Sequence, residues 1–454
     1  MIMMKYLITV ALSTLFVGCS DYLELKPDQK MVIPETLEDC ELLLNDYPTM
    51  NSGYPIMGEV SADNYYLTTT SWQSVSLIDE RNGYIWSDEI VTTATPWQTS
   101  YKAIYQGNQV LDVLENLKTK PADLAHFNEL MGAALFFRAF AFHQLLANYA
   151  LNYSVTNASS MPGIPLRLKP EVDDAVKRAS LTDSYAQVIA DFKSAARLLP
   201  TDGALKARPY RGAAYGGLAR TYLDMGMYEQ AYLYADSALH VRSDLLDYNS
   251  LNANASLPIA RFNKEVLFHA ITSTSYALAQ GAAKIDSNLY RAYEQNDLRK
   301  KVFFKANTGA NAGTYAFKGS YNNTASGMFV GLTTAEMYLI RAESAARLGK
   351  TAAALTDLNH LMKNRWLTGL YSDFYSVDRN AIIAKILAER RKELLFRGLR
   401  WSDLKRLNLG NTDKMQLKRI IDGKEYLLEP NSLKYALLIP QDAIDEGKLE
   451  QNKR

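Results

Sequence analysis

The sequence predicts a mainly α-helical protein built from stacked helix pairs. Apolar residues recur at helical spacing along most of the 454-residue chain, and one segment fits a tetratricopeptide repeat. No stretch alternates between apolar and polar residues for long enough to indicate a large sheet, so short strands are expected only within loops. Hydrophobic residues make up 48% of the chain, which is enough to form a sizeable core.

Residues 1–18 have the pattern of a secretory signal peptide. Lys5 is their only charge, and an apolar run leads to Gly18 and Cys19. This run is too short for a membrane-spanning helix, which needs about 20 apolar residues. A Cys directly after the small residue is typical of a bacterial lipoprotein, so Cys19 is predicted to carry the lipid that anchors the protein. An ordinary secretory peptide with an incidental Cys is the alternative.

Residues 19–35 are predicted to form a lipidated tether, which Pro27 and Pro34 interrupt. If Cys19 is lipidated, Cys40 has no intramolecular partner, because the chain has only two Cys residues. The exported protein then has to be held by its core alone. Its 50 Lys and Arg residues nearly balance its 49 Asp and Glu residues, so the charge indicates neither a nucleic acid nor an anionic membrane surface as a partner.

Helical segments follow one another along the rest of the chain. A hydroxyl and two acids at residues 36–39 are typical of a helix start. Residues 97–117 place apolar side chains on one face, whereas residues 130–149 are apolar almost all round, as in a doubly buried helix. A further helix over residues 181–199 ends before Pro200.

Two segments have the pattern of a helix pair. Residues 215–238 fit a tetratricopeptide repeat closely, with Gly226 at the tight turn and small Ala residues where the two helices approach. A looser copy starts at Tyr338, has Gly349 at its turn, and carries Arg341 where Leu is expected. One repeat cannot bury both of its faces, so the pairs should stack into a curved scaffold. Unrelated helical hairpins are the alternative.

The charged stretch at residues 389–406 has two interpretations. Glu389 and Glu393 lie one helical turn apart, which would suit acid–base chemistry, but Arg390 and Arg397 lie close to them in sequence. Guanidinium groups hold a carboxylate ionised, the opposite of what a general acid requires. The favoured prediction is therefore a salt-bridged clamp between two helices, separated by Gly398.

Two aromatic-rich segments, residues 50–95 and 251–333, lack a helical period. Loops of this length in a compact protein are usually functional. A pyranose packs its CH face on an aromatic ring while amide, carboxylate or guanidinium groups bind its hydroxyls, so saccharide binding is favoured over ordinary packing under long loops. The candidate ligand-binding residues are Asp63, Trp72, Arg81, Trp86, Tyr290, Tyr315 and Tyr321.

The chain as a whole resembles the SusD/RagB family of outer-membrane nutrient-binding lipoproteins. The resemblance covers nearly the whole length and rests on the order of several segments rather than on one motif. These segments are Cys19 and residues 96–108, 138–140, 163–166, 191–200, 214–222, 335–343, 389–406, 439–440 and 451–452.

This resemblance implies a right-handed superhelix of about four tetratricopeptide-like helix pairs, with long loops, short β-hairpins and a ligand site on one face. It divides the chain into an N-terminal half, residues 36–250, with tetratricopeptide-like helices and ligand loops, and a C-terminal half, residues 251–454. It also implies a non-catalytic, lipid-anchored protein on the outer face of the cell outer membrane. Such proteins cap a SusC-like TonB-dependent barrel and pass it oligosaccharides or, in some branches, peptides.

Two other classes of function remain open. An all-helical toroid glycoside hydrolase or lyase would need an unpaired acid in an aromatic cleft, for which Asp63 and Asp88 are the nearest candidates. A pure scaffold would bind only protein through its repeats. The sequence predicts no cofactor and no metal, because the five His residues lack metal-ligand spacing and neither G-x-S-x-G nor G-x-G-x-x-G occurs.

Overall fold

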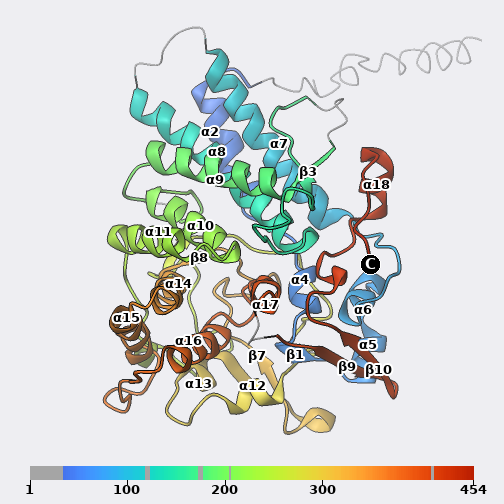
Figure 1. The fold of residues 1–454 in the computed structure, drawn as a ribbon, viewed down its shortest axis with the longest axis vertical. Helices are drawn as coiled ribbons and strands as arrows, with labels where there is room; N and C mark the ends of the chain where they lie inside the picture. The colour runs from blue at the N-terminus through green and yellow to red at the C-terminus, as the bar shows by residue number, and fades with distance from the viewer. Residues whose placement is uncertain (1–33, 118–122, 172–176, 204–205, 411–413) are drawn as a thin grey trace, which may run out of the picture. The chain divides into compact units, whose positions relative to one another are not determined.

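The computed structural model describes residues 34–117, 123–171, 177–203, 206–410 and 414–454 (Figure 1). Thr36–Arg454 form one compact unit, separate from Met1–Glu35. The predicted signal peptide, Cys19 and nearly all of the tether therefore lie outside the described residues. The main core contains residues from both predicted halves, and their border at residue 250 stays a prediction.

A helix array forms the larger part of the compact unit, and each of its helices packs on the next (Figure 1). Its order in the figure runs from the top of the view towards the lower left. The array consists of α2 (Leu37–Asn45), α7 (Thr95–Asn116), α8 (Leu124–Tyr149), α9 (Leu181–Leu198), α10 (Arg211–Asp224), α11 (Tyr228–Val241), α14 (Thr334–Arg347), α15 (Thr351–Lys363) and α16 (Arg379–Glu393).

The central helix of the array is α8, which is apolar on nearly all sides as the sequence predicts. It is long and apolar enough to cross a membrane by composition, but 83% of its apolar window is buried by the rest of the protein, as expected for a core helix. Phe136 and Phe140 pack against Phe268, with ring centroids 4.6 and 5.1 Å apart. At the edge of the same core, the thiol of Cys40 on α2 is fully buried, and burial raises its pKa to about 11.

Both predicted repeats form helix pairs, α10 with α11 and α14 with α15. Gly226 and Gly349 at their turns have φ values of +70° and +80°, and a Cβ at either position would meet nothing within 4 Å. The turns therefore require Gly for its backbone conformation and not for close helix approach. Arg341, which replaces the expected Leu, pairs with Asp236 at 2.7 Å and with Asp357 at 2.6 Å, and so links α14 to both neighbouring helices.

The strands are short, as predicted, and every sheet among the described residues has two antiparallel strands. The pairs are β1 (Tyr65–Tyr66) with β5 (Lys284–Ile285), β2 (Pro162–Pro165) with β3 (Arg178–Ser180), β4 (Val266–Phe268) with β8 (Leu332–Thr333), β6 (Phe304–Ala306) with β7 (Tyr315–Phe317), and β9 (Leu417–Ile421) with β10 (Lys424–Leu428). The mainly α-helical fold with short strands is confirmed.

The two aromatic-rich segments form a loop layer with a core of its own. They lie side by side because β1 pairs with β5, and Tyr54 forms a parallel bridge with Thr272. The layer contains helices too short to produce a visible period in the sequence, which is why they were not predicted. The short helices of the described chain are α3 (Tyr47–Met50), α4 (Met57–Ser61), α5 (Thr69–Ser74), α6 (Ile78–Tyr84), α12 (Ser287–Arg291), α13 (Arg299–Phe303), α17 (Arg400–Asn408) and α18 (Gln441–Gly447).

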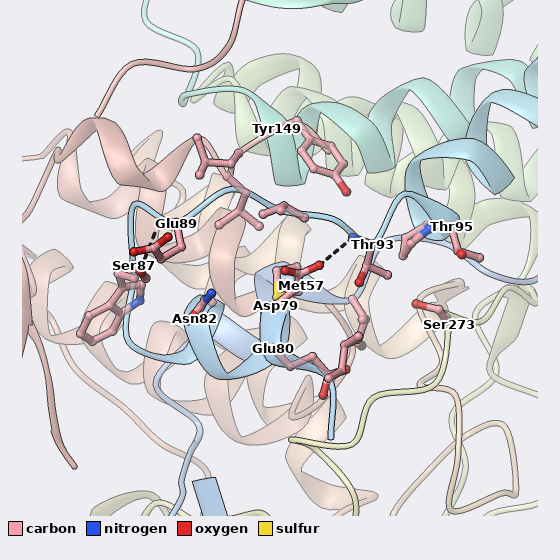
Figure 2. Close-up of a pocket in the computed structure, with 18 of the residues that line it drawn as sticks. Met57, Asp79, Glu80, Asn82, Ser87, Glu89, Thr93, Thr95, Tyr149 and Ser273 are labelled. Atoms are coloured by element: carbon pink, nitrogen blue, oxygen red, sulfur yellow. Dashed lines mark hydrogen bonds between the residues drawn. The ribbon is translucent and has the colours of Figure 1, made fainter. Parts of the chain in front are cut away.

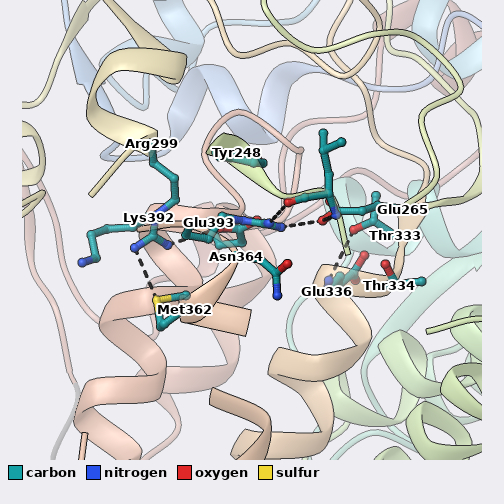
Figure 3. Close-up of polar contacts among 12 residues, drawn as sticks. Tyr248, Glu265, Arg299, Thr333, Thr334, Glu336, Met362, Asn364, Lys392 and Glu393 are labelled. Carbon is teal, nitrogen blue, oxygen red and sulfur yellow. Dashed lines mark hydrogen bonds and ion pairs between the residues drawn. The ribbon is translucent and has the colours of Figure 1, made fainter. Parts of the chain in front are cut away.

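The predicted clamp exists, but its partners differ from the predicted ones. Glu393 pairs with Arg299 at 3.2 Å (Figure 3) and with Arg365 at 2.8 Å. The charge of Arg397 also acts on Glu393, but the two side chains form no ion pair. Glu389 pairs with Arg299 at 2.5 Å. Although burial raises the pKa of Glu389, the charges of Arg299 and Lys392 bring it down to about 2, so this carboxylate stays ionised.

The link between α16 and α17 is made by Arg390, which binds Asp403 at 2.9 Å instead of pairing with Glu389. Arg397 lies over the ring of Tyr321, 3.4 Å from its centroid. The prediction failed in detail because Arg299 and Arg365 are distant in sequence from the charged stretch and only the fold brings them to it.

Candidate ligand-binding site

A cavity of about 210 Å³ lies beside α6 and the segment that follows it, and we call it the α6 cavity (Figure 2). Its walls come from both aromatic-rich segments, from Tyr149 at the end of α8, and from the C-terminal part of the chain. It is smaller than the roughly 300–1,000 Å³ of typical ligand pockets. It therefore has room for one small unit of a ligand, such as a single ring.

Apolar side chains form much of the wall of the α6 cavity, including Met57, Leu77 and Val91. Trp86 lies at its edge in the left-handed backbone region, with φ of +55°. Its ring is only 4% exposed, and its Nε1 donates to the carbonyl of Ser61 at 3.0 Å. Trp86 therefore supports the wall from behind, which contradicts the prediction that it offers an open stacking face.

Asp79 provides the main polar group of the α6 cavity. Its Oδ2 accepts a hydrogen bond from the backbone nitrogen of Thr93 at 2.6 Å (Figure 2) and another from that of Thr92 at 2.9 Å, and these bonds fix the carboxylate. Its Oδ1 is buried without a hydrogen-bond partner among the described residues, and so is Oγ of Ser273 in the same wall. Buried polar atoms normally have partners, so these two atoms are suited to bind the hydroxyl groups of a ligand.

Charged residues tie the surrounding segments together. Glu80 accepts from the backbone nitrogen of Ala277 at 2.7 Å, which joins the two aromatic-rich segments, and burial raises its pKa. Lys434 donates to the carbonyl of Trp86 at 3.0 Å and pairs with Asp88 at 2.9 Å. The C-terminal part of the chain is thereby fixed over the cavity.

The two acids proposed for the hydrolase alternative are both paired. Asp88 binds Lys434, as described above. Asp63 accepts from Nε and Nη2 of Arg400 at 2.6 and 2.9 Å and lies 3.1 Å from Arg391. Burial raises the pKa of Asp63, but the charge of Arg400 outweighs it and holds that pKa well below its usual range. Neither acid is the unpaired group that this alternative requires, and neither lines the α6 cavity.

Trp72 and Arg81 contact each other and do not line the α6 cavity. Nε1 of Trp72 donates to the carbonyl of Arg81 at 3.0 Å, and the Arg81 guanidinium lies 5.7 Å from the Trp72 ring centroid. Both side chains are half-buried.

Tyr290 and Tyr315 stack on each other, with centroids 3.6 Å apart and planes at 14°. The ammonium of Lys300 lies 4.9 Å from the Tyr290 ring. Both rings are half-buried, and neither lines the α6 cavity, so their role in binding stays a prediction. Tyr321 is fully buried and donates to Glu265 at 2.5 Å, so the prediction that it presents a face to ligand is wrong.

Of the predicted ligand residues, the structure brings only Trp86 to the α6 cavity. The residues that sequence analysis missed are Asp79, Thr93, Tyr149 and Ser273. No local motif marks them, because each comes from a separate segment and gains its place only through folding. The Thr pair at residues 92–93, the source of the Asp79 bonds, is a weak turn signal at best.

Two family models match the chain. The model described as "Starch-binding associating with outer membrane" matches residues 21–223, and the model described as "SusD family" matches residues 261–450. A protein named SusD-like protein P2 from Formosa agariphila is 23% identical over 482 residues, which cover 90% of this chain and 92% of its own length.

Solved structures share the fold over nearly the whole compact unit. A SusD superfamily protein from Bacteroides thetaiotaomicron has a TM-score of 0.75 at 22% identity, covering 92% of this chain and 100% of that one. Surface glycan-binding protein A from Bacteroides uniformis has a TM-score of 0.69 at 17% identity, covering 92% and 98%. At these identities, the likeness establishes the fold and leaves the ligand open.

Proposed function

Because the chain belongs to the SusD/RagB family, we propose that it is a non-catalytic, saccharide-binding lipoprotein of the cell outer membrane, facing the exterior. Cys19 carries the lipid, the α6 cavity holds one unit of an oligosaccharide, and a SusC-like TonB-dependent barrel receives the ligand for import. One structural relative is itself named a surface glycan-binding protein, which supports a saccharide ligand.

The observation that carries the saccharide assignment is the pair of unsatisfied atoms in the α6 cavity. Oδ1 of Asp79 accepts a hydrogen bond from a sugar hydroxyl, and Oγ of Ser273 accepts or donates one, while the apolar wall packs against the ring. Burial of an oxygen without a partner costs about 1–3 kcal/mol, which a bound hydroxyl would remove. The small volume favours one terminal or protruding unit over a long stretch of chain.

The non-catalytic assignment rests on the pairing of Asp63, Asp79, Asp88 and Glu80, and the other acid of the cavity wall, Glu89, is exposed. Asp63 and Asp88 are bound by basic side chains, and Oδ2 of Asp79 is held by two backbone nitrogens. A retaining or inverting hydrolase needs two carboxyl groups on opposite sides of one bond, one of them with a raised pKa. Glu80 has a raised pKa, but its side chain is engaged by Ala277.

Asp79→Asn tests the site without changing the size of the side chain. The amide oxygen still accepts from Thr92 and Thr93, but the amide nitrogen replaces Oδ1 and only donates. We expect oligosaccharide affinity to fall about tenfold or more, measured by calorimetric titration with malto-, xylo- and manno-oligosaccharides. Asp112→Asn makes the same change of charge at an exposed position on α7 that does not line the cavity, and it should leave affinity unaltered.

Three results of that experiment would refute the proposal. Binding of short peptides but of no saccharide would assign the chain to the peptide-binding alternative. New reducing ends after incubation would make it an enzyme. Equal affinities of Asp79→Asn and the unmodified protein would move the site away from the α6 cavity.

The lipid anchor has a separate test. Cys19→Ala removes the only acceptor that the signal provides, so the secreted variant should leave the membrane fraction when no barrel partner is expressed. Full retention in the outer membrane, measured by fractionation of cells without that partner, would contradict the anchor.

A further inference from the structure

A second cavity, of about 620 Å³, opens between the end of α2, α3 and the segment that leads into α10, and we call it the Arg208 cavity. It shares no lining residue with the α6 cavity. Tyr47, Asn51, Lys206, Arg208 and Phe262 are the wall residues that matter here. The volume is large enough for a sugar unit with its substituents.

Positive charge is left uncompensated in the Arg208 cavity. Arg208 makes no hydrogen bond or ion pair with any described residue, and its Nη1 is buried. No acid lines the described wall, although Glu129 and Glu41 act on Arg208 from further away. A half-buried guanidinium with one fully buried and unpartnered nitrogen is unusual, because burying a charge is costly unless a counter-charge accompanies it.

The wall around Arg208 is held in place on both sides. Nδ2 of Asn51 donates to the carbonyls of Ala207 and His269, each at 2.8 Å. The backbone nitrogen of His269 donates to the carbonyl of Lys206 at 2.9 Å, and Nζ of Lys206 donates to the carbonyl of Asn263 at 2.8 Å. These bonds fix the position of the backbone that carries Arg208.

Aromatic rings and a second cation flank the same opening. Phe262 has φ of +57°, a strained conformation for an aromatic residue, and its ring is 40% exposed. The guanidinium of the exposed Arg261 lies 4.9 Å from the Tyr47 ring centroid and 4.8 Å from that of Phe262. Backbone strain of this kind is common at functional sites. Here it keeps the Phe262 ring partly exposed to solvent near Arg208 and Arg261.

We propose that the Arg208 cavity binds a sugar unit that carries an oxyanion, either a carboxylate or a sulfate. Arg208 and Arg261 bind the oxyanion through charge-assisted hydrogen bonds, and the exposed part of the Phe262 ring packs on the sugar. The inference rests on the proposed saccharide-binding function and narrows it to acidic saccharides.

Calorimetric titration tests the inference with three probes. Trigalacturonate carries carboxylates, a sulfated galactose oligosaccharide carries sulfates, and maltotriose is the neutral control. The variants are Arg208→Gln and Arg261→Gln, with Arg197→Gln as a matched control, because Arg197 is exposed on α9 and lines neither cavity. Thermal melts accompany each titration.

We expect at least one acidic probe to bind more tightly than maltotriose and to weaken with added salt. Loss of either Arg208 or Arg261 should lower that affinity by about tenfold, because each loss removes a charge-assisted hydrogen bond, and should also flatten the salt dependence. Arg197→Gln should match the unmodified protein. The carboxylate and sulfate arms identify which oxyanion the site takes.

Phe262→Gly provides a second measurement that does not depend on the folding of the arginine variants. It relieves the strained backbone and removes the ring, so the protein should stay as stable as before while acidic-probe affinity falls. Acidic-probe affinity that is unchanged in all three variants overturns the inference. Binding of maltotriose alone also overturns it but leaves the proposed function intact, whereas failure of every saccharide to bind refutes both.

Discussion

Two arginines on either side of the start of α10 have opposite surroundings. Arg220, within the helix array, binds both carboxylate oxygens of Glu336 at 2.7 Å and donates to the carbonyls of Val330 and Gly331. Arg208, at the edge of the loop layer, binds no described residue. Arg220 is fully buried, whereas Arg208 is half-buried with a fully buried Nη1, and the two differ most in the number of partners that their guanidinium groups have.

The same contrast extends to the two regions as wholes. Buried charges in the array mostly form ion pairs between helices, such as Arg138 on α8 with Asp191 on α9 at 2.7 Å. In the loop layer, Oδ1 of Asp79 and Oγ of Ser273 stay unsatisfied at the wall of a cavity. Arg211 Nε, Ser344 Oγ and Arg390 Nη1 are exceptions within the array, but these residues line neither cavity. Unsatisfied groups indicate a site only where a cavity adjoins them.

The largest expected effect comes from breaking the pairing in the array. Glu393→Ala leaves the fully buried Arg299 (Figure 3) and Arg365 with one carboxylate fewer. Loss of one partner of a buried ion pair costs about 3–5 kcal/mol, so the free energy of unfolding should fall by that amount in a denaturant titration. Glu115→Ala, an exposed change on α7, is the control. Saccharide affinity of the folded variant should be unaltered, and its loss at full stability would make Glu393 part of the site.

A smaller effect is expected from Glu59 on α4, where the loop layer meets the turn before α17. Its oxygens accept from Asn64 at 3.1 Å and from the backbone nitrogen of Gly398 at 3.0 Å, and burial raises its pKa from 4.5 to about 7. Between these two pH values, the folded protein keeps a proton that the unfolded chain releases. Stability therefore falls as pH rises through this window, by about 3 kcal/mol in total for this group.

Glu59→Gln isolates that contribution because all other groups titrate equally in both proteins. The stability advantage of the unmodified protein over the variant should shrink as pH rises from about 4.5 to 7. Denaturant titrations at several pH values provide the measurement. Parallel stability curves for the two proteins would show that Glu59 does not hold its proton in this range.

The smallest expected effect tests the turns of the array. Gly226→Val places a β-branched residue at φ of +70°, which should cost about 1–3 kcal/mol in the free energy of unfolding. Gly281→Val is a matched control in the loop layer, because a Cβ there also meets nothing within 4 Å and no left-handed φ is required. Equal melting temperatures of the two variants would contradict the assigned turn.

The helix array could be predicted from the sequence because the patterns that indicate its helices and turns are local. The Ala spacing of residues 215–238, the glycines at the two repeat turns and the apolar surface of α8 each act within a few turns of helix. The α6 cavity could not be predicted from local sequence signals. Asp79 and Ser273 are far apart in the chain, and their incomplete hydrogen bonding exists only once the segments are folded together.

Aromatic residues misled the prediction for a related physical reason. Composition shows that rings are present in a loop but not which side of them faces the core. Tyr321 donates a hydrogen bond to Glu265, and Trp86 donates one to the Ser61 carbonyl. Both bonds lie inside the protein, as is usual for buried Tyr and Trp side chains. A salt-bridged clamp could be predicted because many charged residues lie close together at residues 389–406. Its ion-pair partners could not be predicted, because they come from distant parts of the chain.

The buried thiol of Cys40 can report local unfolding of the protein, because it reacts only when it becomes exposed. Only a thiolate reacts readily with alkylating reagents, and a pKa of about 11 together with complete burial keeps that form scarce and shielded. In an oxidising compartment, this residue is therefore protected against pairing with other thiols for as long as α2 stays docked on α7. The rate at which a reagent labels it in the folded protein measures how often α2 detaches.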